Sequence, residues 1–337
     1  MRRYYIIGLV ILLGTGCTKY PKPAGVAGSQ LQLLQYAAQD TNLTLYEMAL
    51  QRAGMTTDST FSSGGPYTVF AAQDSAFLQQ GMTAAVIKAF DTAALRSILE
   101  YSIINGRTSD QDLTGFYTEQ VTSLNPLYEP TLTKNYYGIF LNGAPVVKPD
   151  IELGDGVMQE TGHLILPPTG NLMQEVDSLP ELSFFAAALH KNAFLRSFLL
   201  MPNPTAPDYN TGGSYFGITL LAPTNSAFMD FGFADTLAVQ AADSAYMEHL
   251  LGAYIYAGAH YTSEFLGGAI FGGGSLPNFP PLYYQANFGQ PGIFSVEANG
   301  MTFQSTANVL YTVQIIKPDI TATNGVMQEL NNILIVQ

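Results

Sequence analysis

An internal repeat limits the possible folds of this 337-residue chain more than any other feature. In the longest repeated block, nine of thirteen positions are identical. Two copies of about 140–165 residues are each long enough to be a domain, and two are too few to stack as a solenoid. We therefore predict two domains of one fold, at 31–168 and 172–337. Three blocks recur in the same order, 43–50 as 182–189, 68–77 as 219–228, and 148–160 as 317–329.

Both copies show the same succession of hydrophobic patterns. Apolar residues at helical spacing predict a first helix in each copy. A short apolar strand follows (68–71 and 218–221), and then a helical middle (84–104 and 238–256). The apolar residues of the first helices are Leu43, Tyr46 and Leu50 in one copy and Leu182, Phe185 and Leu189 in the other.

The last third of each copy predicts strands joined by tight turns. Dipeptides of the Asn-Gly or Asp-Gly type lie between apolar runs, and such pairs adopt the positive φ angles that two-residue hairpin turns need. They are Asn142-Gly143, Asp155-Gly156, Asn299-Gly300 and Asn324-Gly325. We therefore predict an α+β fold for each domain, with helices packed on antiparallel β-hairpins in a β-sandwich wedge.

The N-terminus has the pattern of an export signal. Two arginines precede an apolar run, 4–13, that is shorter than the roughly 20 residues of a membrane-spanning helix. The Gly-Thr-Gly-Cys that follows is similar to the lipobox of bacterial lipoproteins. That resemblance implies that a signal peptide, 1–16, is removed, that Cys17 is lipidated, and that 17–30 form a lipidated tether. The alternative is an ordinary signal peptide with an incidental cysteine.

The charge and the cysteine content exclude several kinds of partner. A net charge of −13 opposes binding to phosphate backbones, so we expect no nucleic-acid partner. Membrane contact is expected through the lipid anchor, at the outer membrane of a Gram-negative bacterium. Cys17 is the only cysteine, so no intramolecular disulfide or Cys-x-x-Cys metal site can form. We predict no cofactor and no metal.

The repeated blocks resemble the two motifs of the fasciclin domain. The first, Thr-x-Phe-Ala-Pro-x-Asn/Asp-x-Ala-Phe, is matched at 219–228 and, with Ala72 in place of its proline, at 68–77. The closing motif, Asp-Ile-x-x-x-Asn-Gly-Val, lies in both long blocks and is followed by apolar strands expected at 164–167 and 333–336. The resemblance implies two fasciclin-like domains and a role in adhesion or binding.

One feature of that family is missing. Fasciclin domains often carry a Tyr-His pair in a middle motif, which is linked to adhesion in some members. The corresponding pairs here are Tyr101-Ser102 and Tyr254-Ile255, so neither copy has the histidine. We assign no binding role to these positions and expect the tyrosines to pack in the core.

Residues that could support catalysis or metal binding are scattered. Asp110 and Asp112 lack the further oxygen ligands of a calcium loop. The glycine-rich run 267–274 lacks the Gly-Lys-Ser/Thr ending of a phosphate loop. Asp74 and Asn225 each follow a strand and are expected to cap a helix. No metal-ligand spacing joins any two of the histidines, which are His163, His190, His249 and His260.

Aromatic segments are the better candidates for a binding surface. The second copy has an insertion rich in Gly and Pro at 267–292. Its aromatic residues, which include Phe288, could form an exposed face together with the Tyr136-Tyr137 pair of the first copy. The alternative, favoured for the tyrosines, is that they are strand residues packed in the core. The candidate binding residues of the insertion are Phe271, Phe279, Tyr283 and Tyr284.

Three classes of function remain, and adhesion comes first. We predict a non-enzymatic adhesion or interaction protein of the cell envelope with a protein or carbohydrate ligand. The alternative is an accessory lipoprotein that captures glycans or other polymers for an outer-membrane uptake system, and it would need an exposed aromatic groove in the insertion. An enzyme would need clustered polar side chains in a deep pocket, and no such cluster is evident in the sequence.

Overall fold

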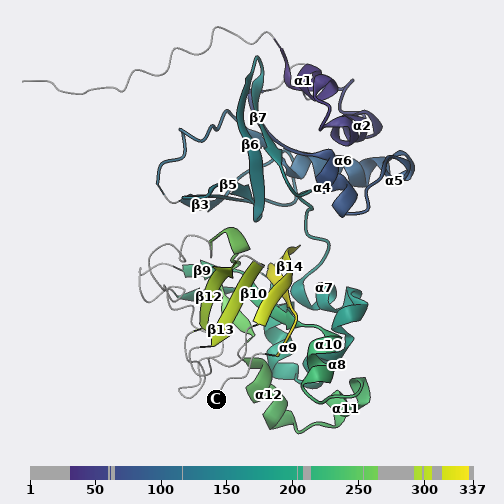
Figure 1. Cartoon of the computed structure of the whole chain (residues 1–337), viewed down its shortest axis with the longest axis vertical. Coiled ribbons are helices and arrows are strands. Elements are labelled where there is room, and N and C mark those ends of the chain that lie inside the picture. The colour runs from purple at the N-terminus through teal and green to yellow at the C-terminus, as the bar shows by residue number, and fades with distance from the viewer. Residues whose placement is uncertain are drawn as a thin grey trace, which may run out of the picture.

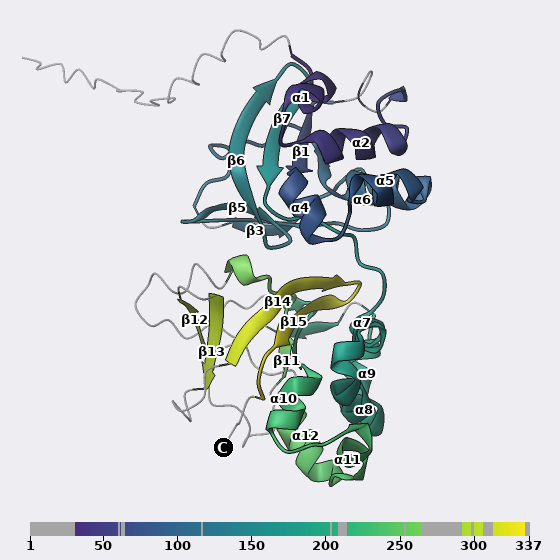
Figure 2. The same ribbon diagram turned by 45° about the vertical axis from the view of Figure 1, so that its right-hand side comes forward.

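A computed structural model arranges the chain as two domains that follow each other along its long axis (Figure 1). In each domain a group of helices lies beside a sheet (Figure 2). None of the described helices is long and apolar enough to cross a membrane. The structure describes residues 31–59, 61, 65–115, 117–202, 204–207, 214–252, 254–264, 292–297, 300–305 and 313–333.

In the first domain most helices come early in the chain and most strands come late, as the repeat predicts. Its elements are α1 (Leu33–Gln39), α2 (Thr44–Arg52), β1 (Tyr67–Ala72), α4 (Asp74–Gln79), α5 (Ala84–Ala89), α6 (Thr92–Tyr101), β2 (Ile103–Asn105), β3 (Tyr117–Gln120), β4 (Thr131–Asn135), β5 (Gly138–Leu141), β6 (Ala144–Leu153) and β7 (Gly156–Thr161).

The second domain repeats this order with additional elements. They are α7 (Leu172–Ser178), η1 (Pro180–Leu182), α8 (Ser183–Lys191), α9 (Ala193–Leu200), β8 (Thr205–Pro207), β9 (Ser214–Phe216), β10 (Ile218–Pro223), α10 (Asn225–Asp230), α11 (Thr236–Ala241), α12 (Ser244–Gly252), β11 (Ile255–Ala257), β12 (Gly292–Glu297), β13 (Gly300–Ser305), β14 (Val313–Ala322) and β15 (Gly325–Leu330).

The two main sheets have the same topology over six strands, and the first sheet has β3 as an additional edge strand. Their strand orders are β2-β1-β7-β6-β5-β4-β3 and β11-β10-β15-β14-β13-β12. Most neighbours are antiparallel, but β1 pairs in parallel with β7 and β10 pairs in parallel with β15, in the registers Tyr67↔Gly156 and Ile218↔Gly325. This pairing brings the second and third repeated blocks of each copy side by side. The predicted α+β class is confirmed.

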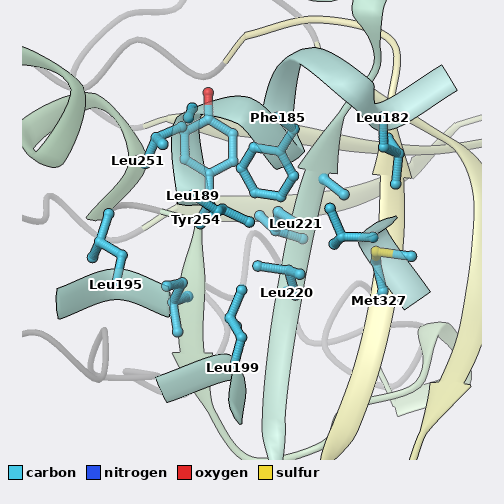
Figure 3. Close-up of a cluster of buried hydrophobic side chains, with 14 of the residues drawn as sticks. Leu182, Phe185, Leu189, Leu195, Leu199, Leu220, Leu221, Leu251, Tyr254 and Met327 are labelled. Carbon is cyan, nitrogen blue, oxygen red and sulfur yellow. The ribbon is translucent and has the colours of Figure 1, made fainter. Parts of the chain in front are cut away.

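The helices are amphipathic, and their apolar faces form one core with the sheet in each domain. In the second domain Phe185 and Leu189 of α8 point toward Leu220 of β10 and Met327 of β15 (Figure 3). All four side chains are fully buried. Each such side chain contributes about 1.5–3 kcal/mol to stability, so these contacts, more than helix propensity, hold the short helices in place.

Several predicted boundaries differ from the structure. The helical middles end earlier than expected, because Ile103–Asn105 and Ile255–Ala257 are strands that pair with β1 and β10. The strand expected at 164–167 is an unpaired segment, and Ile333, the only described residue of 333–336, is not in a strand. Leu164 and Ile165 are nevertheless buried, since they pack against core residues instead of joining the sheet.

The predicted hairpin turns exist, but two of them lie one residue earlier than the predicted dipeptides. Asn142-Gly143 is the β5–β6 turn, with φ angles of 47° and 77°. The next turn consists of residues 154 and 155, and Gly156 already begins β7. Likewise, residues 323 and 324 form the β14–β15 turn. The remaining dipeptide, Asn299-Gly300, lies partly outside the described residues.

Candidate functional site

The repeated Lys-Pro-Asp-Ile block forms a polar network on the last hairpin of each domain. The backbone nitrogen of Asp150 donates to Gln159 Oε1 over 2.9 Å, and Gln159 Nε2 donates back to Asp150 Oδ1 over 2.9 Å. Asp319 and Gln328 make the same two bonds, at 2.8 and 2.9 Å. Both aspartates have positive φ angles, 57° and 62°, at a bulge in the strand. The network holds a backbone conformation that non-glycine residues rarely adopt.

A lysine of the same block neutralises a buried glutamate in each domain. Lys148 Nζ lies 2.8 Å from a carboxylate oxygen of Glu160, which is fully buried. Lys317 Nζ lies 3.0 Å from that of Glu329. Hydrogen bonds to Asp40 and Glu160 raise the pKa of Lys148, so this cation stays charged. The identical residues of the repeat therefore serve the fold.

Asp74 and Asn225 cap helices, although not those they begin. Asp74 Oδ1 accepts a hydrogen bond from the backbone nitrogen of Leu45 in α2, over 2.7 Å. Asn225 Oδ1 accepts one from Phe184 in α8, over 2.9 Å. Each side chain satisfies an otherwise unpaired N–H in the first turn of the neighbouring helix. The strand end is thereby tied to the first core helix of its own domain.

The middle-motif tyrosines are packed in the interior, as predicted. Tyr254 is fully buried and its ring lies 6.2 Å from that of Phe185. Tyr101 is also buried, and its hydroxyl accepts a hydrogen bond from Asn142 Nδ2 over 2.8 Å. Because this bond fixes the side chain of Asn142, Tyr101 helps to shape the β5–β6 turn.

That turn touches the second domain. A methyl group added at Gly143 would lie 2.0 Å from Asp319 Oδ2, so only glycine fits. A second contact lies nearby, where Asn135 Nδ2 donates to the backbone oxygen of Ser263 over 2.7 Å. The end of the first sheet thus rests on the bulge of β14, and the polar network around Asp319 is part of the domain interface.

Asp319 has several hydrogen-bond donors at this interface but no cation among the described residues. Thr262 donates through its backbone nitrogen, over 2.8 Å, and through its hydroxyl, over 2.5 Å. Burial raises the pKa of Asp319 to about 6, against the opposing effect of these bonds and that of Gln328, and the nearby Glu264 adds to the rise. The hydroxyl of Tyr261 is a further titratable group close by, and burial raises its pKa as well.

A cavity of about 500 Å³ lies between the domains beside this contact. From the first domain it is lined by Gln79, Gln80, the β5–β6 turn and the segment 163–167. From the second it is lined by Glu175, Thr262 and 316–321. Its volume falls within the range of about 300–1,000 Å³ that is usual for binding pockets. Hydroxyl, amide and carboxylate groups share its walls with apolar side chains.

Comparison with known proteins places this geometry in a family. The model of the fasciclin domain matches the chain twice, at residues 41–167 and 180–336. The chain belongs to the fasciclin family. Its two fasciclin domains are similar to a solved FAS1 domain pair from the insect cell adhesion molecule fasciclin I, with 14% identity and a TM-score of 0.41, over 86% of this chain and 95% of that one. No curated protein matches it.

In this fasciclin pair the described histidines are separate from one another. His163 and His190 are exposed, and His190 lies 2.8 Å from Asp177. His260 lies 2.8 Å from Glu264. The side chain of His249 is outside the described residues. Among the residues that the structure describes, no group of three or more His, Cys, Asp or Glu side chains is placed to hold a metal ion.

Asp110 and Asp112, which were considered as calcium ligands, bind neighbouring protein groups instead. Asp112 accepts hydrogen bonds from the backbone nitrogen and the hydroxyl of Ser109, over 2.9 and 2.7 Å. Asp110 lies 3.0 Å from Lys134 Nζ. Both side chains therefore stabilise the loop before β3.

The expectation that Tyr136 and Tyr137 pack in the core is wrong. They form the β4–β5 turn of the first fasciclin domain and are 79% and 53% exposed. A turn position directs both side chains away from the sheet, which the spacing of the flanking apolar residues does not reveal. The other candidates, Phe271, Phe279, Tyr283, Tyr284 and Phe288, lie outside the described residues, as does Cys17.

Sequence reasoning missed the interdomain cavity. Its walls come from α4, the β5–β6 turn, the linker and β14, which are far apart in the sequence. The Asn-Gly dipeptide at 142–143 lies in the cavity wall and was singled out in the sequence. A hairpin turn within the first domain explains this dipeptide fully, so it did not indicate a contact with the second domain.

Proposed function

We propose that this fasciclin pair is a lipid-anchored adhesion or interaction protein of the cell envelope. Fasciclin domains are associated with cell adhesion and interaction, and both halves of the chain match this domain. The proposed anchor is Cys17, with 17–30 as the tether and the outer membrane as the site of attachment. The apolar run and the Gly-Thr-Gly-Cys sequence at the N-terminus support this part of the proposal.

The exposed Tyr136-Tyr137 pair is the observation that carries the proposal. The two rings meet edge to face with their centres 5.8 Å apart. Asn135 fixes the turn, because its Oδ1 accepts a hydrogen bond from the backbone nitrogen of Tyr137 over 2.8 Å while its Nδ2 bonds to Ser263. Tyrosines offer a large contact area at a low cost in side-chain entropy, and a good anchor contributes about 2 kcal/mol or more to binding.

Attachment of cells tests this function. Cells that display the full chain are allowed to settle on a layer of fixed cells of the same strain and on surfaces coated with protein or polysaccharide, and the force that detaches them is measured. We expect the chain to increase attachment to at least one of these surfaces. The double variant Tyr136→Ser, Tyr137→Ser should lower the affinity of the chain for that surface by about tenfold or more, and the force that detaches the cells should fall with it.

A matched control separates recognition from general surface effects. Tyr246 of α12 is also exposed, at 47%, and Tyr246→Ser removes the same chemical group from the other domain. Attachment should survive this change. Attachment no greater than that of cells without the chain would refute the proposed function. Equal attachment by all three proteins would refute the role of the tyrosine pair.

A further inference from the structure

One wall of the interdomain cavity is an extended stretch of main chain, at 164–166. Within the described part of the chain, the backbone groups of these residues form no hydrogen bond. On the facing domain, the described pairing of β14 with β13 ends at Gln314, before the cavity-lining residues 316–320. Unpaired main chain next to a cavity is suited to binding an extended peptide, which supplies the missing donors and acceptors.

Apolar side chains stand beside these backbone groups. Leu166 and Ile316 both line the cavity and are 41% and 52% exposed. They come from different domains, so a chain lying between them would cover apolar surface of both. Covering it contributes to affinity in proportion to the area removed from water.

The charges in the cavity favour a cationic occupant. Glu175 accepts a hydrogen bond from the Thr169 hydroxyl over 2.6 Å, and neither Glu175 nor Asp319 has a cationic partner among the described residues. The one lysine in the wall, Lys317, is already paired with Glu329 and Glu181. The net charge of −13 adds a long-range attraction for basic ligands.

We propose that the interdomain cavity binds an extended basic segment of a partner protein. The segment lies along 164–166, hydrogen-bonds to that main chain, and places a lysine or arginine side chain between Glu175 and Asp319. Its apolar atoms contact Leu166 and Ile316. This inference rests on the proposed function and gives it a partner chemistry, and it uses a surface distinct from the tyrosine pair.

A titration with designed peptides tests the charge requirement. The chain without its proposed signal peptide, 17–337, is titrated against fluorescent acetyl-Thr-Arg-Ile-Arg-Thr-amide and against a twin in which citrulline replaces both arginines. Citrulline keeps the shape of arginine and removes its charge. We expect the arginine peptide to bind about tenfold or more tightly than the twin, because charge-assisted hydrogen bonds are roughly twice as strong as neutral ones.

Variants of the protein locate the site. Glu175→Gln and Asp319→Asn keep the shape of each side chain and should each weaken binding of the arginine peptide by about three- to tenfold. Asp230→Asn makes the same change of charge at an exposed position of α10 and should leave binding unchanged. Glu175 is on the surface helix α7, so its variant remains informative even if Asp319→Asn alters the interface.

Methylated peptides test the role of the main chain. Methyl groups on alternate backbone nitrogens should abolish binding in one register and spare it in the other, as in strand pairing. Equal binding of the citrulline twin, an equal effect of Asp230→Asn and Glu175→Gln, or displacement of the peptide by a neutral hexaglucan would overturn the inference. Tyrosine-dependent attachment without peptide binding would refute this inference alone, and peptide binding without attachment would refute the adhesion proposal alone.

Discussion

Replacing Gly143 by alanine should separate the two fasciclin domains. Gly143 has a φ angle of 77°, where an alanine costs about 1–2 kcal/mol. Its methyl group would also lie 2.0 Å from Oδ2 and 2.6 Å from Cγ of Asp319. Non-bonded atoms do not approach that closely. Either the carboxylate of Asp319 gives up its hydrogen bonds to Thr262 and Gln328, or the β5–β6 turn moves away from β14. We expect both changes to weaken the contact between the domains.

Gly54 provides the matched control. Its φ angle is 75°, it lies in the same domain, and an added methyl group would meet nothing within 4 Å. Gly54→Ala should therefore lower the stability of the first domain by about 1–2 kcal/mol through the backbone alone. Gly143→Ala should have the same backbone cost and the further loss of the interface.

Two measurements distinguish these costs. Calorimetry reports the stability of each domain, and small-angle X-ray scattering reports the distance between them. We expect Gly143→Ala, and not Gly54→Ala, to increase the radius of gyration and to separate the unfolding of the domains. In a double-mutant cycle, Asp319→Ala should cost less stability in the Gly143→Ala background than in the parent. An unchanged radius and an additive cycle would show that the contact does not hold the domains together.

Three further predictions follow from the charges and the N-terminus. The pKa of Asp319, raised from 3.8 to about 6, means that the native state binds more protons than the unfolded state between these values, so the free energy of unfolding should fall as pH rises from about 4 to 6, by at most about 3 kcal/mol. Denaturant titrations of Asp319→Asn should lack this fall, and a parent curve that rises there would contradict the assignment. Lys148→Met should destabilise the first domain by about 1–3 kcal/mol, because it removes the cation beside the buried Glu160; water screens part of this pair, since the Lys148 side chain is 45% exposed, and Lys88→Met at an exposed position should cost almost nothing in the same melts. Cys17→Ala should abolish incorporation of labelled fatty acid and release the protein from the membrane fraction, and a labelled, membrane-bound variant would disprove the anchor.

Much of the fold follows from the sequence because its signals are local or repeated. The helical spacing at Leu43 and Tyr46 and the Asn142-Gly143 dipeptide depend on neighbouring residues, and the structure confirms the helix and the turn. Because each pattern occurs in both copies, the second copy supports the prediction made from the first. The errors lie at 164–167 and at the ends of the helical middles, where an apolar run has the same appearance whether it pairs in a sheet or packs against it.

The exposed tyrosines and the cavity required the tertiary structure. Tyr136 and Tyr137 are apolar enough for a core strand, and only the position of the β4–β5 turn places them in solvent. Both copies contain the same aspartate network, yet only Asp319 meets the other domain. The repeat by itself determined that two similar domains would form, because each buries its own apolar pattern. The folded arrangement decided which surfaces face each other, because that depends on the packing of residues far apart in the chain and not on the pattern within either copy.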